Sequence, residues 1–241
     1  MSELTLSPQN TNLVPLEDLE PSTFRLVMTL AVAGFFSGLI LVGIFLVTQP
    51  MIEANKAAAL KEAIFKVLPG CKDFKTLELR DGKLFKVQSE GGNAKSKTEK
   101  IFAGFNENGN FIGFAIPGGE PGFQDIISGI FGFEPGKAII IGFEVLESKE
   151  TPGLGDKIMK DKGFQANFKA LAVDPEIIAV KPGKKAKVKS GKYSNEVETI
   201  TGATISSKAV VRLLDKTVKK WKKPIKEYLK SNTPGKAGSK K

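Results

Sequence analysis

The chain has 241 residues, enough for one domain of ordinary size with short appendages, and 41% of them are hydrophobic. It contains no histidine and a single cysteine, Cys71, which excludes an internal disulfide, a four-cysteine zinc site and a cysteine-ligated iron–sulfur cluster. The net charge of +10 suits nucleic acid or an anionic membrane surface, but the lysine-rich stretches are not interleaved with aromatic residues, so we expect no nucleic-acid partner.

The N-terminal part predicts a membrane anchor. Residues 1–24 are polar and acidic and predict a loosely ordered tail. Residues 26–47 then form a run of 22 without a charge, and a helix needs about 20 apolar residues to cross a bilayer. A buried core helix is the alternative reading, although such runs are rare in soluble domains. A cleaved signal peptide fits poorly, because the start is acidic and the apolar run is too long. We therefore predict a transmembrane helix over residues 25–48.

The middle of the chain predicts a β-rich domain over residues 49–230, entered by an amphipathic helix over residues 51–68. The dipeptides Asp81-Gly82 and Asn108-Gly109 separate pairs of apolar runs and predict two hairpins, with a polar loop over residues 88–99 between them. The glycine-rich residues 118–136 surround an apolar stretch to which we assign no element. The run AIIIGFEVLE, residues 138–147, predicts a long strand buried on both faces.

The C-terminal part predicts short helices followed by one long helix. Short helices are expected up to Phe168, and a strand over residues 177–188 with a turn at Pro182-Gly183. Residues 206–222 place their apolar side chains on one helical face, and Pro224 is expected to interrupt this helix. Residues 231–241 have the composition of a disordered basic tail.

The segment EVETITGATISS, residues 196–207, suggests a site for an anion. It reads as a strand end, a turn of small residues and a helix start, where Gly202 allows a ligand to approach the backbone closely and Ser206 or Ser207 can cap the helix. The free N–H groups and the dipole of such a helix start favour a phosphate. The plainer alternative is an ordinary capped helix after a tight turn.

A second segment, ETPGLG at residues 150–155, forms a shaped turn directly after the predicted long strand. Such a loop could lie against a flat ring and offer it backbone hydrogen bonds. On its own, however, the pattern indicates only a turn that ends a strand.

Together these segments resemble the FMN-binding domain shared by the G subunit of Rnf complexes and the C subunit of the sodium-pumping NADH:quinone oxidoreductase. That family carries the motif Asp-x-x-Ser/Thr-Gly-Ala-Thr, whose last threonine receives the FMN phosphate, and it carries Glu-Thr-Pro-Gly-Leu-Gly beside the flavin. All six residues of the second motif match at 150–155, whereas Glu198 stands where the first motif usually has Asp. The single N-terminal helix and the chain length also match.

The resemblance implies an α+β fold with an N-terminal transmembrane helix and a domain of antiparallel strands with packed helices. It implies FMN bound covalently to Thr204 through a phosphoester, and an electron-transfer subunit that is not catalytic alone and holds no metal. The implied cofactor-binding residues come from the two motifs and the start of the following helix: Glu150, Thr151, Pro152, Gly153, Leu154, Gly155, Thr201, Gly202, Ala203, Thr204 and Ser206.

The implied partners are the lipid bilayer, a flavin transferase during maturation, and the other membrane and peripheral subunits of an Rnf-type ferredoxin:NAD oxidoreductase coupled to ion translocation. The chain has no strand-associated GxGxxG pattern and is not expected to bind nicotinamide itself. Two alternatives stay open. They are the C subunit of the quinone-reducing complex and a flavin-free structural membrane subunit.

The orientation in the membrane is contested by two arguments. Near the predicted transmembrane helix, only Arg25 lies on the N-terminal side, whereas Lys56, Lys61 and Lys66 lie on the other, which by the positive-inside rule favours a cytoplasmic domain. The resemblance implies an extracytoplasmic FMN domain on the cytoplasmic (inner) membrane. We expect the extracytoplasmic arrangement, because long domains translocate largely regardless of charge.

Overall fold

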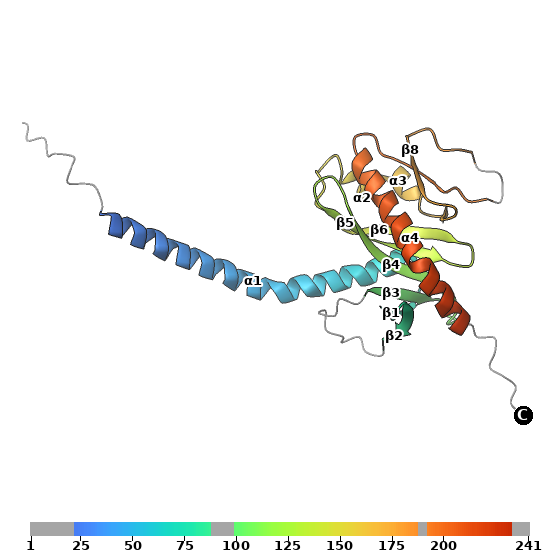
Figure 1. The fold of residues 1–241 in the computed structure, drawn as a ribbon, viewed down its shortest axis with the longest axis horizontal. Coiled ribbons are helices and arrows are strands. Elements are labelled where there is room, and N and C mark those ends of the chain that lie inside the picture. The colour runs from blue at the N-terminus through green and yellow to red at the C-terminus, as the bar shows by residue number, and fades with distance from the viewer. Residues whose placement is uncertain (1–21, 88–98, 188–191, 233–241) are drawn as a thin grey trace, which may run out of the picture. The chain divides into compact units, whose positions relative to one another are not determined.

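The computed structural model describes residues 22–87, 99–187 and 192–232. Most of both predicted tails and most of the predicted loop over residues 88–99 lie outside this part of the chain. The tail predicted over residues 1–24 ends earlier than expected, because α1 begins at Thr23. The structure divides into two compact units, Met1–Asn55 and Lys56–Lys241. An apolar N-terminal helix is followed by antiparallel strands with packed helices, which confirms the predicted α+β class (Figure 1).

Helix α1 (Thr23–Val67) is long and apolar enough to cross a membrane, and none of its most apolar stretch is buried. The sequence predicts separate helices on either side of Pro50, and this is wrong, because α1 is continuous across it. Proline removes one backbone donor and so costs the helix one hydrogen bond. In the turn before Pro50, the Thr48 hydroxyl adds a side-chain bond by donating to Ile44 O at 2.9 Å.

Seven strands of the described residues form one antiparallel sheet in the order β2-β1-β3-β4-β5-β6-β7. Both predicted hairpins are confirmed, one joining β1 to β2 and the other β3 to β4. The glycine-rich stretch without an assigned element supplies the end of β4 and all of β5. The strands are β1 (Asp73–Arg80), β2 (Lys83–Lys86), β3 (Lys100–Phe105), β4 (Phe111–Pro121), β5 (Ile126–Glu134), β6 (Ile139–Glu147) and β7 (Leu171–Ala172).

A second, smaller sheet pairs β8 (Ile178–Val180) with β9 (Glu196–Glu198) in parallel. The strand predicted over residues 177–188 is therefore much shorter than expected. It ends at the predicted turn, where Lys184 N donates to Lys181 O at 3.0 Å. The short helices expected after Gly155 are α2 (Lys157–Lys160) and α3 (Lys162–Ala166).

The large sheet is covered on both faces. Successive residues of a strand point to opposite sides, so one strand contributes to the packing on each face. On β4, Phe114 and Ile116 belong to the main core with the apolar side chains of α3 and α4 (Thr204–Asn232). Ala115, between them, belongs to a smaller cluster with Ile64 and other residues from the end of α1. The end of α1 and helix α4 thus pack on opposite faces.

Helix α4 extends ten residues beyond the end predicted for it, to Asn232, and the expected interruption at Pro224 is wrong. A proline inside a helix costs about 3 kcal/mol. Burial of a large apolar side chain returns about 1.5–3 kcal/mol. Around Pro224, Trp221 and Ile225 are buried, and Tyr228 packs against the same core, so apolar contacts on both sides of the proline offset its cost.

The end of α1 meets the sheet at two glycines that face each other on β5 and β6. Gly132 pairs with Gly142, and a Cβ added to Gly142 would lie 2.8 Å from Val67 Cα. A Cβ at Gly132 would collide with the Val67 carbonyl oxygen. The backbone of α1 therefore lies directly on the sheet at this point, where a side chain cannot be accommodated.

Replacing Gly132 by valine should destabilise the domain by about 1–3 kcal/mol or more, because overpacking forces the backbone of α1 away from β5. Urea unfolding of the detergent-purified protein would measure the change in the free energy of unfolding. Gly136→Ala is the matched control, since an added Cβ there has no heavy atom within 4 Å. Equal stability of the two variants would contradict this packing.

Candidate functional site

The two motif segments lie on either side of an open depression of about 330 Å³. One wall is the loop after β6 and the other is the first turn of α4. The turn between β4 and β5 closes a third side. The lining residues are Phe123, Glu150, Thr151, Leu154, Gly155, Gly202, Ala203, Thr204, Ile205 and Ser206.

The TGAT turn leads directly into α4. Gly202 has a φ of 83°, a left-handed conformation that favours glycine. The helical hydrogen bonds begin with Ser207 N donating to Ala203 O at 2.9 Å, so the N–H groups of residues 204–206 precede the bonded ladder. These residues line the depression, and the free N–H groups and dipole of a helix start suit an anion.

The sequence predicts that Ser206 or Ser207 caps this helix, and this is wrong. Helix α4 begins at Thr204, so both serines lie in its first turn. The Ser207 hydroxyl accepts a hydrogen bond from Ile200 N at 3.1 Å and donates to Ala203 O at 2.8 Å. Ser207 therefore ties the TGAT turn to the helix, and Ser206 points elsewhere, to Glu150.

The three threonines of the motif have different surroundings. Thr199 is buried, and its hydroxyl donates to Val180 O at 3.1 Å. Thr201 is exposed but lines a neighbouring depression of about 400 Å³ instead. Thr204 is exposed and lines the depression shared by both motifs. Of the three, only Thr204 presents a hydroxyl at the helix start beside that shared depression.

Glu198, the acidic residue of the motif, lies at the end of β9 and also lines the neighbouring depression. Its Oε1 accepts a hydrogen bond from Gly183 N at 2.9 Å. The acid therefore holds the turn after β8 and belongs to the opposite side of the TGAT turn from Glu150.

Glu150 is a buried carboxylate at the centre of the shared depression's wall. Its Oε1 accepts from the backbone N–H groups of Phe123, at 2.8 Å, and Gln124, at 3.1 Å. Its Oε2 accepts from the Ser206 hydroxyl at 2.5 Å. Burial alone would raise the pKa of Glu150, but these hydrogen bonds outweigh it and hold the pKa below the usual glutamate range.

The loop after β6 turns tightly. Leu154 N donates to Thr151 O at 3.1 Å, and Gly153 has a φ of 77°. Leu154 is half exposed and lines the depression, whereas Pro152 and Gly153 are exposed and do not line it. Gly155 is buried, and a Cβ there would lie 2.5 Å from Glu150 Oε2 and 2.9 Å from Ser206 Oγ.

Sequence reasoning missed two residues of the depression, Phe123 and Ile205. Both carry large apolar side chains that are more than half exposed, at 65% and 52%. Ile205 follows Thr204 directly and could have been included as its neighbour. Phe123 lies between Gly122 and Gln124 in the stretch without an assigned element, and its place beside the motifs depends on the pairing of β4 with β5.

A second contact fixes α4 against the end of β4. Glu120 Oε1 accepts from Arg212 Nε at 3.2 Å and from Lys216 Nζ at 2.7 Å. Arg212 also donates to Pro121 O at 3.2 Å. Helix α4 is thus bonded directly to the residues where the turn between β4 and β5 begins, and it is linked to the same turn through Glu150.

Comparison with known proteins agrees with this geometry. Residues 122–219 match the FMN-binding domain family. The G subunit of the Na(+)-translocating ferredoxin:NAD(+) oxidoreductase complex of Acetobacterium woodii is 31% identical over 169 residues, which span 68% of this chain and 74% of that protein. The chain belongs to the family of G subunits of Rnf-type complexes. The G subunit of the ion-translocating oxidoreductase complex of Methanosarcina acetivorans is 28% identical over 194 residues, 80% of this chain and 92% of that protein.

The fold of this G-subunit family member is also seen in more distant proteins. NqrC from Shewanella oneidensis matches 72% of this chain and 99% of its own, with a TM-score of 0.56 and 19% identity. The C subunit of the Na(+)-translocating NADH-quinone reductase from Parabacteroides distasonis has a TM-score of 0.52 at 21% identity, over 71% of this chain and 94% of its own. At this identity the likeness concerns the fold alone.

Replacing Gly155 by alanine should disturb the depression, because the new methyl group would lie within contact distance of both Glu150 and Ser206. We expect a loss of about 1–3 kcal/mol in the free energy of unfolding. Thermal unfolding of the purified protein would measure it. Gly119→Ala is the matched control, since its Cβ would have no neighbour closer than 3.4 Å. An unshifted melting temperature for Gly155→Ala would mean that Glu150 and Ser206 are not packed as described.

Proposed function

We propose that this chain is the membrane-anchored, electron-transferring G subunit of an Rnf-type ferredoxin:NAD oxidoreductase coupled to ion translocation, and that it carries FMN in a phosphoester bond to Thr204. The observation that carries the proposal is the single depression shared by ETPGLG and TGAT, with an exposed threonine at the start of a long helix. Membership of the G-subunit family supports the same assignment.

The residues of the depression fit FMN. Thr204, in the first turn of α4, offers the hydroxyl for a phosphoester, and the N–H groups of residues 204–206 suit the phosphate charge. The exposed apolar side chains of Leu154, Ile205 and Phe123 line the same depression and can cover a flat ring. When bound, FMN supplies transfer of electrons singly or in pairs, and the protein supplies binding and orientation.

Each part of the chain has a distinct task in this proposal. The loop 151–155 and Phe123 shape the ring side of the depression, and Thr201, Gly202 and Ala203 set the path of the backbone at the phosphate side. Glu150 and Ser206 join the two sides. Helix α1 holds the domain at the lipid bilayer. A flavin transferase makes the Thr204 bond during maturation, and partner subunits supply and accept the electrons.

We further propose that the FMN domain lies on the extracytoplasmic side of the cytoplasmic membrane. The resemblance supports this side, and the charge bias against it is small, with Lys56, Lys61 and Lys66 on one side of the apolar stretch and Arg25 on the other. Long domains translocate largely regardless of such a bias.

Thr204→Ala should abolish covalent FMN and leave the domain folded, since an exposed hydroxyl at a helix start contributes no more than about 1 kcal/mol. The denatured wild-type protein should fluoresce in a gel under ultraviolet light, and the variant should be dark. Thr201→Ala is the control and should keep its fluorescence. A dark wild-type band would indicate a flavin-free structural subunit, and flavin mapped to Thr199 or Thr201 would refute the attachment site.

The orientation can be tested with Lys226→Cys in a Cys71→Ser background. Lys226 is exposed on α4, whereas Cys71 is buried. A membrane-impermeant maleimide should label the introduced cysteine in intact cells. Ser2→Cys in the same background is the control and should be labelled only after the membrane is broken. The opposite pattern would place the domain in the cytoplasm.

A further inference from the structure

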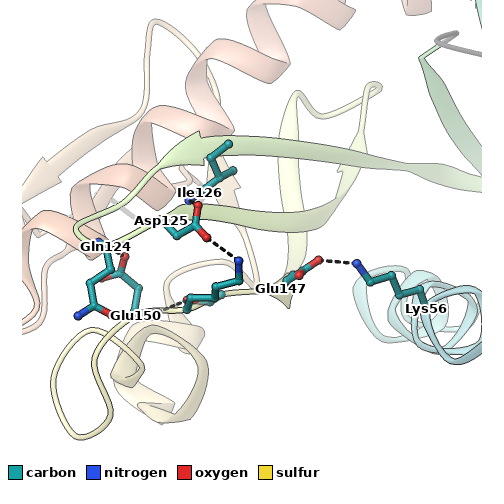
Figure 2. A network of polar contacts seen from close by, with 8 residues as sticks. Lys56, Gln124, Asp125, Ile126, Glu147 and Glu150 are labelled. Atoms are coloured by element: carbon teal, nitrogen blue, oxygen red, sulfur yellow. Dashed lines mark hydrogen bonds and ion pairs between the residues drawn. The ribbon is translucent and has the colours of Figure 1, made fainter. Parts of the chain in front are cut away.

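The Glu150 side chain begins just beyond β6 and ends inside the protein, with 6% of its surface exposed. Two of the residues before it form ion pairs. Glu147 pairs with Lys56, and Lys149 pairs with Asp125 at 2.9 Å (Figure 2). Figure 2 shows Glu150 beside Gln124, in the turn between β4 and β5.

Both carboxylate oxygens of Glu150 are engaged by the protein itself. Oε1 takes the N–H groups of Phe123 and Gln124, and Oε2 takes the Ser206 hydroxyl. Glycines lie against each oxygen. A Cβ at Gly122 would collide with Oε1, and a Cβ at Gly155 would lie 2.5 Å from Oε2. The space is therefore shaped for one carboxylate at the full length of a glutamate side chain.

The turn that carries Phe123 depends on this carboxylate. Within the turn, Gly122 N donates to Asp125 O at 2.9 Å, and Asp125 Oδ1 accepts from Ile126 N at 2.7 Å. The N–H groups of Phe123 and Gln124 are given to Glu150 instead. The Phe123 side chain is 65% exposed and lines the depression, so these backbone bonds fix a side chain that borders the site.

We propose that Glu150 is a positioning residue that joins the Phe123 turn to the first turn of α4 and so sets the width of the cofactor depression. This inference rests on the proposed function, because the depression is taken as the FMN site. Glu150 acts through the length and hydrogen-bonding capacity of its side chain. Its negative charge is not required for this role, because the reach and the hydrogen bonds of the side chain hold the two segments together.

Variants at Glu150 can show whether the length of the side chain or its negative charge holds the two segments together. Glu150→Gln keeps the length and an oxygen that can accept from Phe123 and Gln124, and its amide can donate to Ser206. Glu150→Asp keeps the charge but is one methylene too short to hold both segments. Glu150→Ala has neither property. Glu147→Gln, at an exposed site at the end of β6, is the control.

The flavin readout is collisional quenching of flavin fluorescence by iodide in the full-length, detergent-purified protein. Glu150→Ala and Glu150→Asp should increase the quenching constant several-fold, because the Phe123 turn no longer covers the site. Glu150→Gln and Glu147→Gln should match the wild type. The proposal would be overturned if Glu150→Asp kept the wild-type quenching constant while Glu150→Gln raised it. Unchanged quenching in both Glu150→Ala and Glu150→Asp would also overturn it.

A second readout needs no flavin. In a Thr204→Ala background, hydrogen exchange at the Phe123 and Gln124 amides should be several-fold faster with Glu150→Ala or Glu150→Asp, and unchanged with Glu150→Gln. Adding Ser206→Ala to Glu150→Ala should have no further effect, since its partner is already gone. Unaltered exchange would overturn the positioning role. If the exchange rates change as expected but the wild-type protein holds no flavin, the proposed function is refuted and the positioning role of Glu150 stands.

Discussion

A carboxylate removed from water must be given hydrogen-bond donors, and the site of this protein is arranged around that requirement. Glu150 draws its donors from two segments far apart in the chain, the turn at Phe123 and the first turn of α4. Because buried polar groups without hydrogen-bond partners are costly, neither segment can move away without leaving donors and acceptors at Glu150 unpaired. The hydrogen bonds that Glu150 accepts therefore hold in place the two segments that border the depression.

The sheet separates the end of α1 from the helix that carries the proposed FMN site. Its one face receives the end of α1, where Gly132 and Gly142 let the helix backbone approach the strands directly. Its other face receives α4, which carries the TGAT turn at its start and is held to β4 through Glu120. The strands between the faces are closely packed, and close-packed interiors transmit displacement with little loss. The position of the proposed FMN site is therefore fixed relative to the end of α1 that packs on the sheet.

The parts predicted well from the sequence are those that local chemistry determines. The turns at Asp81-Gly82 and Asn108-Gly109, and the apolar face of α4, follow from turn preferences and helical periodicity. Strand β5 is not evident from the sequence because it is buried on both faces and Gly129 and Gly132 interrupt its apolar run, so polar and apolar residues do not alternate along it. The interruption expected at Pro224 is wrong because the cost of the proline is offset by packing of α4 against other elements of the core, which the local sequence does not reveal. Phe123 cannot be placed from the sequence, since it reaches the motifs only through strand pairing.

The hydrogen bonds that arrange the depression also determine the ionisation of Glu150. Burial raises the pKa of this carboxyl, and the donors from Ser206, Gln124 and Phe123 lower it by more. The same donors hold the Phe123 turn to the first turn of α4. The lowered pKa of Glu150 and the fixed position of the turn are therefore two consequences of one set of hydrogen bonds.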